Sequence, residues 1–369
     1  MGSILAPYLW IFCLVYIDDI VVYSKTYEDH IEHLDRILEA VEKSGITLSP
    51  SKCHMFYNSI ILLGHKVSRL GLSTHKSKVK TIFNMLRPTK VADLRTFLGM
   101  AVYFSAFIPH YSSIAAPLFQ LTRKGVRWNW SMDEERAFNA IKDSLVNAPV
   151  LGHPIQGRPY RLYTDASADG LECTLQQVQE IRLADLHSTR AYDRVLRAHA
   201  QHKPVPKLVT SLPADVHDCT FKATWADPID DTTIQVERVI GYWSRTFKPA
   251  EKNYSGTEHK ALAAKEGLVK FQPIIEGEVI ALVTDHAALQ WAKTYENSNH
   301  RLGTWGAVFF AYSPGLRIIH WPGHQHSNVD PLSHLLQHVP EHASPADDDS
   351  PALMTNHAKA PTILFIYCV

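Results

Sequence analysis

Long apolar runs are missing from this chain of 369 residues, although hydrophobic residues make up 46% of it. It has no stretch of about 18 consecutive apolar residues, so the sequence predicts no transmembrane helix and no membrane partner. Cysteine is also scarce, and its five positions show no paired spacing: Cys13, Cys53, Cys173, Cys219 and Cys368. This argues against a disulfide framework or a zinc site and indicates an intracellular, reducing compartment, without choosing between cytoplasm and nucleus.

An excess of charge of either sign is missing too, because 37 Lys and Arg balance 37 Asp and Glu. Nucleic-acid-binding proteins usually carry a basic surface, so the total gives no support to that class. The distribution is uneven, however: the segment 52–95 holds nine basic residues and one acid, Asp93. Such a segment can bind phosphates while acids elsewhere cancel the total. Composition alone favours a simpler interpretation, a solvated lysine-rich surface.

The first 150 residues alternate β-rich and helical patterns. Residues 9–23 form an apolar run interrupted only by Asp18-Asp19, which predicts a strand, a tight turn and a strand. A second hairpin is expected over 53–67, with its turn near residues 58 and 59. Helices are expected from residue 76 onward, the last of them starting at a capping box formed by Ser131 and Glu134.

Beyond Pro149 strands alternate with helices. Strands are predicted over 160–166, 171–178, 239–244, 279–284 and 316–321, and helices over 257–271, 286–293 and 301–312. Three antiparallel strands followed by alternating helix and strand predict a mixed five-stranded sheet with helices on its faces. Residues 179–237 have weak periodicity and are interpreted as a loop insertion, partly helical near 189–200. The tail 339–369 begins rich in Pro, Ser and Asp and is predicted to be disordered.

Four acids stand at the ends of predicted core elements: Asp165, Glu258, Asp285 and Asp330. Carboxylates that converge from different elements can hold two Mg²⁺ or Mn²⁺ ions, because hard cations prefer oxygen ligands. Such a metal pair activates water and stabilises the leaving oxygen of a phosphodiester. Each acid also has a structural interpretation: Glu258 completes a capping box with Ser255, and the aspartates can form turns or helix N-caps.

Five segments carry these acids or lie between them. In chain order they are Tyr163-Thr164-Asp165-Ala166-Ser167, Tyr242-Trp243-Ser244-Arg245, Tyr254-Ser255-Gly256-Thr257-Glu258, Thr284-Asp285-His286 and His320-Trp321-Pro322-Gly323 leading to Asp330-Pro331-Leu332-Ser333. In this order they resemble the ribonuclease H domain of gypsy-type LTR retrotransposon Pol polyproteins. The resemblance implies two-metal hydrolysis of the RNA strand of RNA–DNA hybrids. It also implies that Asp165 bridges both ions, that Asp330 completes one ion's site and that Glu258 and Asp285 complete the other.

The resemblance extends upstream. Tyr16-Ile17-Asp18-Asp19 is similar to the palm hairpin of a reverse transcriptase, and Leu63-Gly64-His65 is similar to the hairpin that grips the primer. It implies metal binding by Asp18 and Asp19. Contacts with a primer–template duplex are expected from Gly64, His65 and the basic residues Lys76, Lys78 and Lys80. The expected organisation is a partial palm over 1–70, thumb and connection over 71–155, and a ribonuclease H-like domain over 156–338.

Two departures from that pattern bear on activity. The fifteen residues before Tyr16 contain no acid, so Asp18 lacks the carboxylate partner from an earlier strand that a polymerase palm uses. Polymerase activity is therefore not expected from this chain alone. In the nuclease part, Glu172 replaces the second glycine of the family's Gly-Leu-Gly and puts a charge where close packing is usual.

Three functions remain open from the sequence: a metal-dependent ribonuclease H-type endonuclease, an inactive nucleic-acid-binding relic of a retroelement, and a protein interaction module presented by the insertion. They differ in one structural expectation. The endonuclease requires that Asp165, Glu258, Asp285 and Asp330 converge within metal-bridging distance. The oligomeric state is not predicted.

Overall fold

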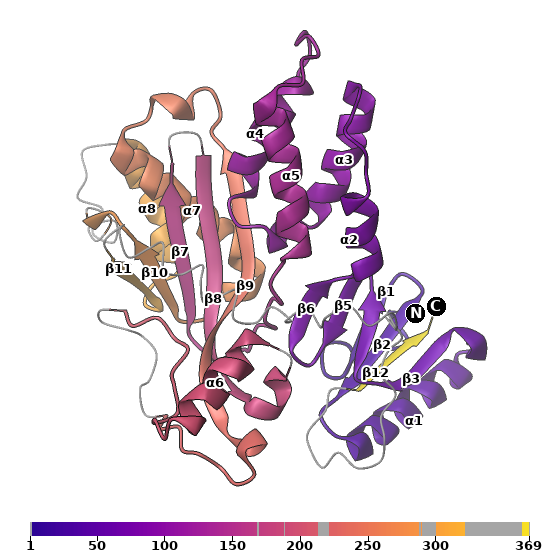
Figure 1. Ribbon diagram of the computed structural model, residues 1–369. Helices are drawn as coiled ribbons and strands as arrows, with labels where there is room; N and C mark the ends of the chain where they lie inside the picture. The colour runs from indigo at the N-terminus through magenta and orange to yellow at the C-terminus, as the bar shows by residue number, and fades with distance from the viewer. Residues whose placement is uncertain are drawn as a thin grey trace. The chain divides into compact units, whose positions relative to one another are not determined.

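The computed structural model describes residues 2–167, 170–187, 189–212, 221–287, 289, 300–321 and 364–368 (Figure 1). The chain divides into two compact units, one formed by Met1–Lys76 with His342–Val369 and the other by Ser77–Glu341. Among the described residues, no helix combines the length and the apolar character needed to cross a membrane.

The first unit contains two sheets. One has the order β1-β2-β12-β3, built from β1 (Cys13–Tyr16), β2 (Asp19–Ser24), β12 (Leu364–Cys368) and β3 (Cys53–Tyr57), with antiparallel neighbours throughout. The helix α1 (Tyr27–Lys43) packs against it through Leu34, Ile37 and Val41. The predicted strand, turn and strand around Asp18-Asp19 are confirmed.

The strand β12 corrects the prediction of a disordered tail over 339–369. That prediction is wrong for Leu364–Cys368, which pairs on one side with β2 and on the other with β3. The five residues are uncharged and either apolar or aromatic, a composition typical of strands. Because β12 pairs on both edges, its backbone N–H and C=O groups form hydrogen bonds within the sheet, whereas those of a disordered segment bind water. Residues 339–363 and Val369 lie outside the described residues.

The second sheet of this unit corrects the predicted hairpin over 53–67. Its strands are β4 (Ser59–Leu62), β5 (His65–Ser68) and β6 (Gly71–Thr74), and β3 does not pair with β4. The turn lies at Leu63 and Gly64, which have φ angles of 49° and 75°. A two-residue turn with positive φ at both positions matches the twist of the flanking strands, and glycine adopts it without strain.

The second unit begins with four helices: α2 (Lys76–Phe83), α3 (Val91–Tyr103), α4 (Tyr111–Leu121) and α5 (Met132–Val146). The predicted capping box of Ser131 and Glu134 starts α5. Two contacts join α4 to the sheet that follows: Ser113 Oγ donates to Glu172 Oε1 over 3.1 Å, and the backbone N–H of Ser112 donates to Ser244 Oγ over 2.8 Å. The charge of Glu172, unusual at its position, therefore serves as an acceptor for α4.

The sheet of the second unit confirms the predicted mixed, five-stranded arrangement. Its strands are β7 (Tyr160–Ala166), β8 (Gly170–Arg182), β9 (Thr233–Thr246), β10 (Ile280–Thr284) and β11 (Leu316–His320). In the order β11-β10-β7-β8-β9, β10 is parallel to both of its neighbours, whereas β7, β8 and β9 are antiparallel. The helices α7 (Gly256–Ile275) and α8 (His300–Ala311) contribute to a core on one face of this sheet.

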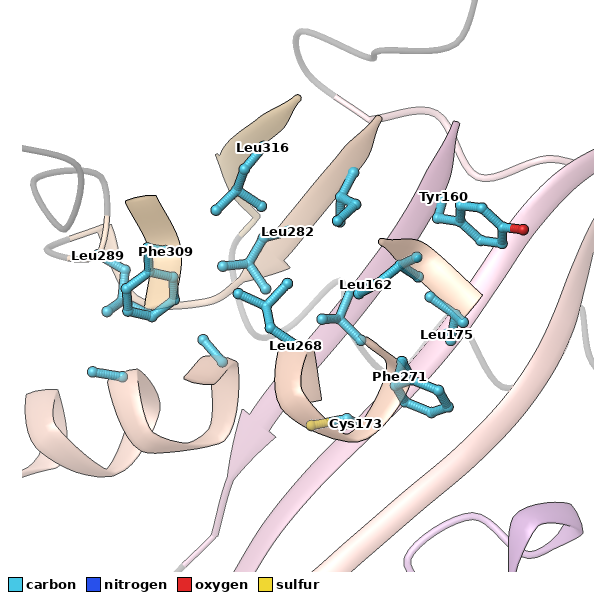
Figure 2. Close-up of a cluster of buried hydrophobic side chains, with 14 of the residues drawn as sticks. Tyr160, Leu162, Cys173, Leu175, Leu268, Phe271, Leu282, Leu289, Phe309 and Leu316 are labelled. Atoms are coloured by element: carbon cyan, nitrogen blue, oxygen red, sulfur yellow. The ribbon is translucent and has the colours of Figure 1, made fainter. Parts of the chain in front are cut away.

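Figure 2 shows this core. Leu162, Leu175 and Leu282 come from three different strands and lie around Leu268 and Phe271 of α7. The helix approaches the sheet closely at Gly267, because a Cβ there would lie 2.8 Å from Cys173 Sγ. Packing of this kind fixes α7, and with it the first turn that carries Glu258, against the strand ends.

The insertion is shorter than the predicted 179–237. Pairing between β8 and β9 continues to Arg182 and Thr233, so residues 179–182 and 233–237 belong to strands. Within the insertion, α6 (Arg190–Ala200) confirms the expected helix. On the sheet face away from α7, Leu212 packs with Tyr163 and Val283, so the insertion covers apolar surface.

Candidate active site

Asp165 and Asp285 lie at the carboxyl ends of adjacent parallel strands. Thr164 of β7 is in register with Thr284, the last residue of β10, and each of these threonines is followed directly by one of the two aspartates. The carboxyl ends of neighbouring parallel strands lie at the same edge of a sheet, where ligand sites of open α/β sheets commonly form. The sheet topology therefore brings together two acids that are 120 positions apart in the sequence.

A single lysine bridges the two aspartates. Lys260, on the second turn of α7, donates from Nζ to Asp165 Oδ1 and, over 2.8 Å, to Asp285 Oδ2. Its side chain is only 17% exposed. Burial by itself lowers the pKa of Lys260, but the hydrogen bonds and charges of Asp165 and Asp285 outweigh burial and the net shift is upward. The ammonium is therefore held in its charged form by the pair.

Glu258 serves as a helix cap in this structure. Its Oε2 accepts from the backbone N–H of Ser255 over 2.8 Å and from Ser255 Oγ over 3.0 Å, while Arg301 donates to Oε1. Arg301 also lies over the ring of Tyr254, 4.0 Å from its centroid. The structural interpretation of Glu258 as half of a capping box is thus correct, and the side chain is not part of the Asp165–Asp285 pair.

The expected convergence of four carboxylates is therefore only partly found. Asp165 and Asp285 come together, Glu258 is held by Ser255 and Arg301, and Asp330 lies outside the described residues. Within the described part of the chain, no group of three His, Cys, Asp or Glu side chains is arranged to hold a metal ion.

The pair itself fits a cation. Both ligand groups are carboxylates, which suit Mg²⁺ or Mn²⁺, and an ammonium already lies between them. The second oxygen of Asp285, Oδ1, is buried and has no hydrogen-bond partner among the described residues. A buried carboxylate oxygen without a partner is costly unless a ligand satisfies it.

Asp18 and Asp19 are placed on a hairpin as predicted. Asp18 is exposed in the turn, and Asp19 opens β2 opposite Tyr16. The other neighbour of β2 is β12, whose Cys368 is in register with Ile20. This strand, Leu-Phe-Ile-Tyr-Cys, contains no acid and supplies no carboxylate beside Asp18.

The three lysines predicted to contact nucleic acid are exposed on α2, but they do not share one face. At 3.6 residues per turn, Lys76 and Lys80 lie about one turn apart on the same side, whereas Lys78 points to roughly the opposite side. Gly64 lies in the β4–β5 turn and His65 opens β5, where burial lowers the pKa of the His65 imidazole.

Sequence reasoning missed Lys260 and Arg301. Both are basic residues on helices, with no local pattern that separates them from solvated ones, and their partners are 25 to 95 positions away. One weak signal exists for Lys260, which follows Glu258 by two positions and directly precedes the apolar, alanine-rich segment 261–264 of α7.

Comparisons with known proteins match different parts of the chain to different families. Residues 1–102 match the family described as reverse transcriptase (RNA-dependent DNA polymerase). Residues 130–205 and 205–312 match two families, each described as an RNase H-like domain found in reverse transcriptase. The chain joins a reverse transcriptase segment to an RNase H-like segment.

Similar proteins include transposon polyproteins. The retrovirus-related Pol polyprotein from transposon opus of Drosophila melanogaster is 26% identical over 374 residues, covering 97% of this chain and 32% of the relative. The transposon Tf2-3 polyprotein of Schizosaccharomyces pombe is 24% identical over 339 residues, covering 91% of this chain and 21% of the relative. The reverse transcriptase and RNase H-like segments are thus similar to parts of transposon polyproteins, and the chain spans a third or less of these two relatives.

Solved structures with a similar fold include the foamy viral protease-reverse transcriptase. Its complex with an RNA/DNA hybrid has a TM-score of 0.62 at 17% identity, covering 96% of this chain and 39% of that chain. The complex with double-stranded DNA has the same score and identity, covering 87% and 56%. This likeness confirms the predicted fold class, a partial reverse transcriptase followed by an RNase H-like sheet.

Proposed function

We propose that the RNase H-like segment hydrolyses the RNA strand of RNA–DNA hybrids, and that the chain derives from a gypsy-type LTR retrotransposon. The observation that carries the proposal is the pairing of Asp165 and Asp285 around one cation at the carboxyl edge of the sheet. Two carboxylates on rigid strand ends are a preorganised site for a divalent ion. The transposon relatives and the order of the sequence motifs support the assignment.

Asp165 and Asp285 would hold Mg²⁺ or Mn²⁺, with Asp330 and Glu258 completing two sites. Bound ions of this kind supply an activated water and stabilise the leaving oxygen of the phosphodiester. The protein itself contributes by holding the carboxylates in fixed positions. The β7–β10 register fixes the two aspartates relative to each other, and Glu258 is buried and held by Arg301 and Ser255. Glu258 would have to leave its cap to reach an ion.

The proposed partners are RNA–DNA hybrid and primer–template duplex. The foamy viral protein of similar fold was solved with an RNA/DNA hybrid and with double-stranded DNA, which makes a duplex a reasonable partner for this chain. In the proposed organisation, the palm-like hairpins and the helices α2 to α5 contribute to duplex binding, with Lys76 and Lys80 exposed on one side of α2.

The test compares substrates of equal sequence: RNA–DNA hybrid, double-stranded RNA, single-stranded RNA and double-stranded DNA. We expect cleavage of RNA in the hybrid alone, with Mg²⁺ or Mn²⁺ and not with EDTA. Asp285→Asn should remove cleavage, whereas Asp133→Asn, which alters an exposed carboxylate on α5, should leave it unchanged. Cleavage that persists in EDTA, or that is equal for all RNA substrates, contradicts the proposal.

A second candidate function is duplex binding without cleavage. It is favoured by the ion pairs of the three described carboxylates: Lys260 pairs with both aspartates, and Arg301 pairs with Glu258. In that case the folded protein binds hybrid but does not cut it at any Mg²⁺ or Mn²⁺ concentration. Asp165→Asn then binds hybrid as well as the unmodified chain does.

A further inference from the structure

We propose that Lys260 is a built-in cation that competes with the divalent metal for Asp165 and Asp285, so that metal binds only by displacing it. The inference rests on the proposed function insofar as it takes these aspartates as the metal ligands. It assigns a role to a residue outside the carboxylate set: Lys260 determines how much metal the site requires.

The geometry gives Lys260 the position of a metal ion. Its Nζ touches one oxygen of each aspartate, and its side chain is largely enclosed. An ammonium at hydrogen-bond distance from both carboxylates occupies the space in which an ion bridging them would lie. Because Lys260 is fixed on α7, which packs along the sheet through Gly267, the ammonium stays close to the pair.

The electrostatics favour competition. Two carboxylates on neighbouring strand ends repel each other, and one ammonium offsets part of that repulsion at short range. A tethered cation also has a high effective concentration, because it loses no translational freedom when it binds. A divalent ion neutralises more charge, but it must first displace the ammonium and be partly dehydrated.

The third carboxylate, that of Glu258, is also paired with a basic side chain. Glu258 lies two positions before Lys260 and is matched by Arg301 and by the N–H and hydroxyl of Ser255. Each of the three described carboxylates therefore has a basic partner within the chain. Lys260 must move away from the aspartate pair before a metal ion can bind between Asp165 and Asp285.

The direct test is Mn²⁺ binding, measured on the full chain by isothermal titration and by the electron paramagnetic resonance signal of free Mn²⁺. Lys260→Gln removes the competing charge and should lower the Kd for Mn²⁺ by tenfold or more. Lys260→Arg keeps a cation and should bind Mn²⁺ as weakly as the unmodified chain. Lys265→Gln, on the same helix but paired with Glu266 over 2.8 Å, is the matched control and should change nothing.

Thermal unfolding provides a second readout that does not depend on nuclease activity. Without metal, Lys260→Gln should unfold at a lower temperature, because the two aspartates lose their counter-charge. Added Mn²⁺ should raise its Tm more than that of the unmodified chain. Should Lys260→Gln fail to fold, Lys260→Met in saturating Mn²⁺ tests the same point. An equal Kd and an equal Mn²⁺-induced shift for variant and unmodified chain overturn the proposal.

The outcomes separate this inference from the proposed function. Tighter Mn²⁺ binding by Lys260→Gln without any hybrid cleavage supports competition and overturns the nuclease assignment. Hybrid cleavage with an unchanged metal requirement in Lys260→Gln overturns competition and supports the nuclease. Loss of cleavage at unchanged Mn²⁺ affinity also overturns competition, since Lys260 then acts on the nucleic acid.

Discussion

Arg161 of β7 and Glu237 of β9 form an ion pair of 2.9 Å in the interior of the second unit, with side chains 1% and 0% exposed. They meet across β8, which lies between their strands. Glu237 also accepts from the hydroxyl of Tyr163 over 2.7 Å and from the N–H of Thr210 over 2.8 Å. Because Arg161 in turn donates to the carbonyl of Thr210, the pair fastens the insertion to the sheet.

We predict that Glu237→Gln lowers the free energy of unfolding of this unit by about 3–5 kcal/mol, because it leaves the Arg161 charge buried without its partner. Urea unfolding followed by hydrogen exchange of the β7 amides measures the change. As a control, Asp133→Asn breaks an exposed pair with Arg136 and should cost less than about 1 kcal/mol. A loss for Glu237→Gln no larger than the control's would show that the buried pair is dispensable.

We predict no primer extension by this chain, even with Asp18 and Asp19 intact. A metal-dependent polymerase site needs a further carboxylate beside the first aspartate, and the adjacent strand β12 contains none. The measurement is template-directed incorporation of labelled nucleotide with Mg²⁺ or Mn²⁺. Incorporation above the level of an Asp18→Asn, Asp19→Asn double variant would contradict the prediction.

We predict that the salt dependence of duplex binding distinguishes the two sides of α2. If Lys76 and Lys80 both contact phosphates, replacing them with Ala should reduce the slope of log K against log salt by about 0.9 for each contact. Lys78→Ala, on the other side of the helix, should leave the slope unchanged. Fluorescence anisotropy of a labelled duplex at several salt concentrations gives the slopes. An equal change in the slope for all three lysine substitutions would contradict the prediction, because it would mean that the lysines act through their general charge and not through contacts on one side of α2.

Much of the second unit could be predicted from the sequence. The strand over 160–166 agrees with β7 at both ends, and the helices over 257–271 and 301–312 agree with α7 and α8 within a few residues. These elements carry strong periodicity and apolar residues that face a single core. The positions of Asp165 and Asp285 at strand ends follow from the same pattern.

What could not be predicted depends on contacts between distant residues. Strands β8 and β9 extend further than predicted because Gln179 of β8 and Glu237 of β9 are buried and have polar partners, His153 and Arg161. From the sequence alone, polar and charged residues at these positions indicate a loop. The turn at Leu63-Gly64 was missed because Asn58-Ser59 carries the stronger local turn signal. Lys260 could not be assigned, since its partners come from two strands far away in sequence.

We predict that β12 stabilises the first unit. Ile366 lies in the middle of this strand, in register with Val22 of β2, and proline there removes a backbone donor from a central strand. Ile366→Pro should increase hydrogen exchange of the β2 and β3 amides, while Ile366→Val, which keeps the donor, should not. Exchange in β7 and β8 of the other unit serves as an internal reference. Unchanged protection of β2 in the proline variant would contradict a structural role for β12.

The most direct test of the proposed nuclease is the cleavage of a hybrid labelled on its RNA strand, measured for the folded full chain and for Asp165→Asn across a range of Mn²⁺ concentrations. We expect the unmodified chain to cut the RNA strand only when divalent metal is present. Asp165→Asn should stay at background at every concentration, because it lacks one of the two carboxylates that share the cation. Cleavage by Asp165→Asn equal to that of the unmodified chain, or no cleavage by the folded unmodified chain at saturating Mn²⁺, would contradict this expectation.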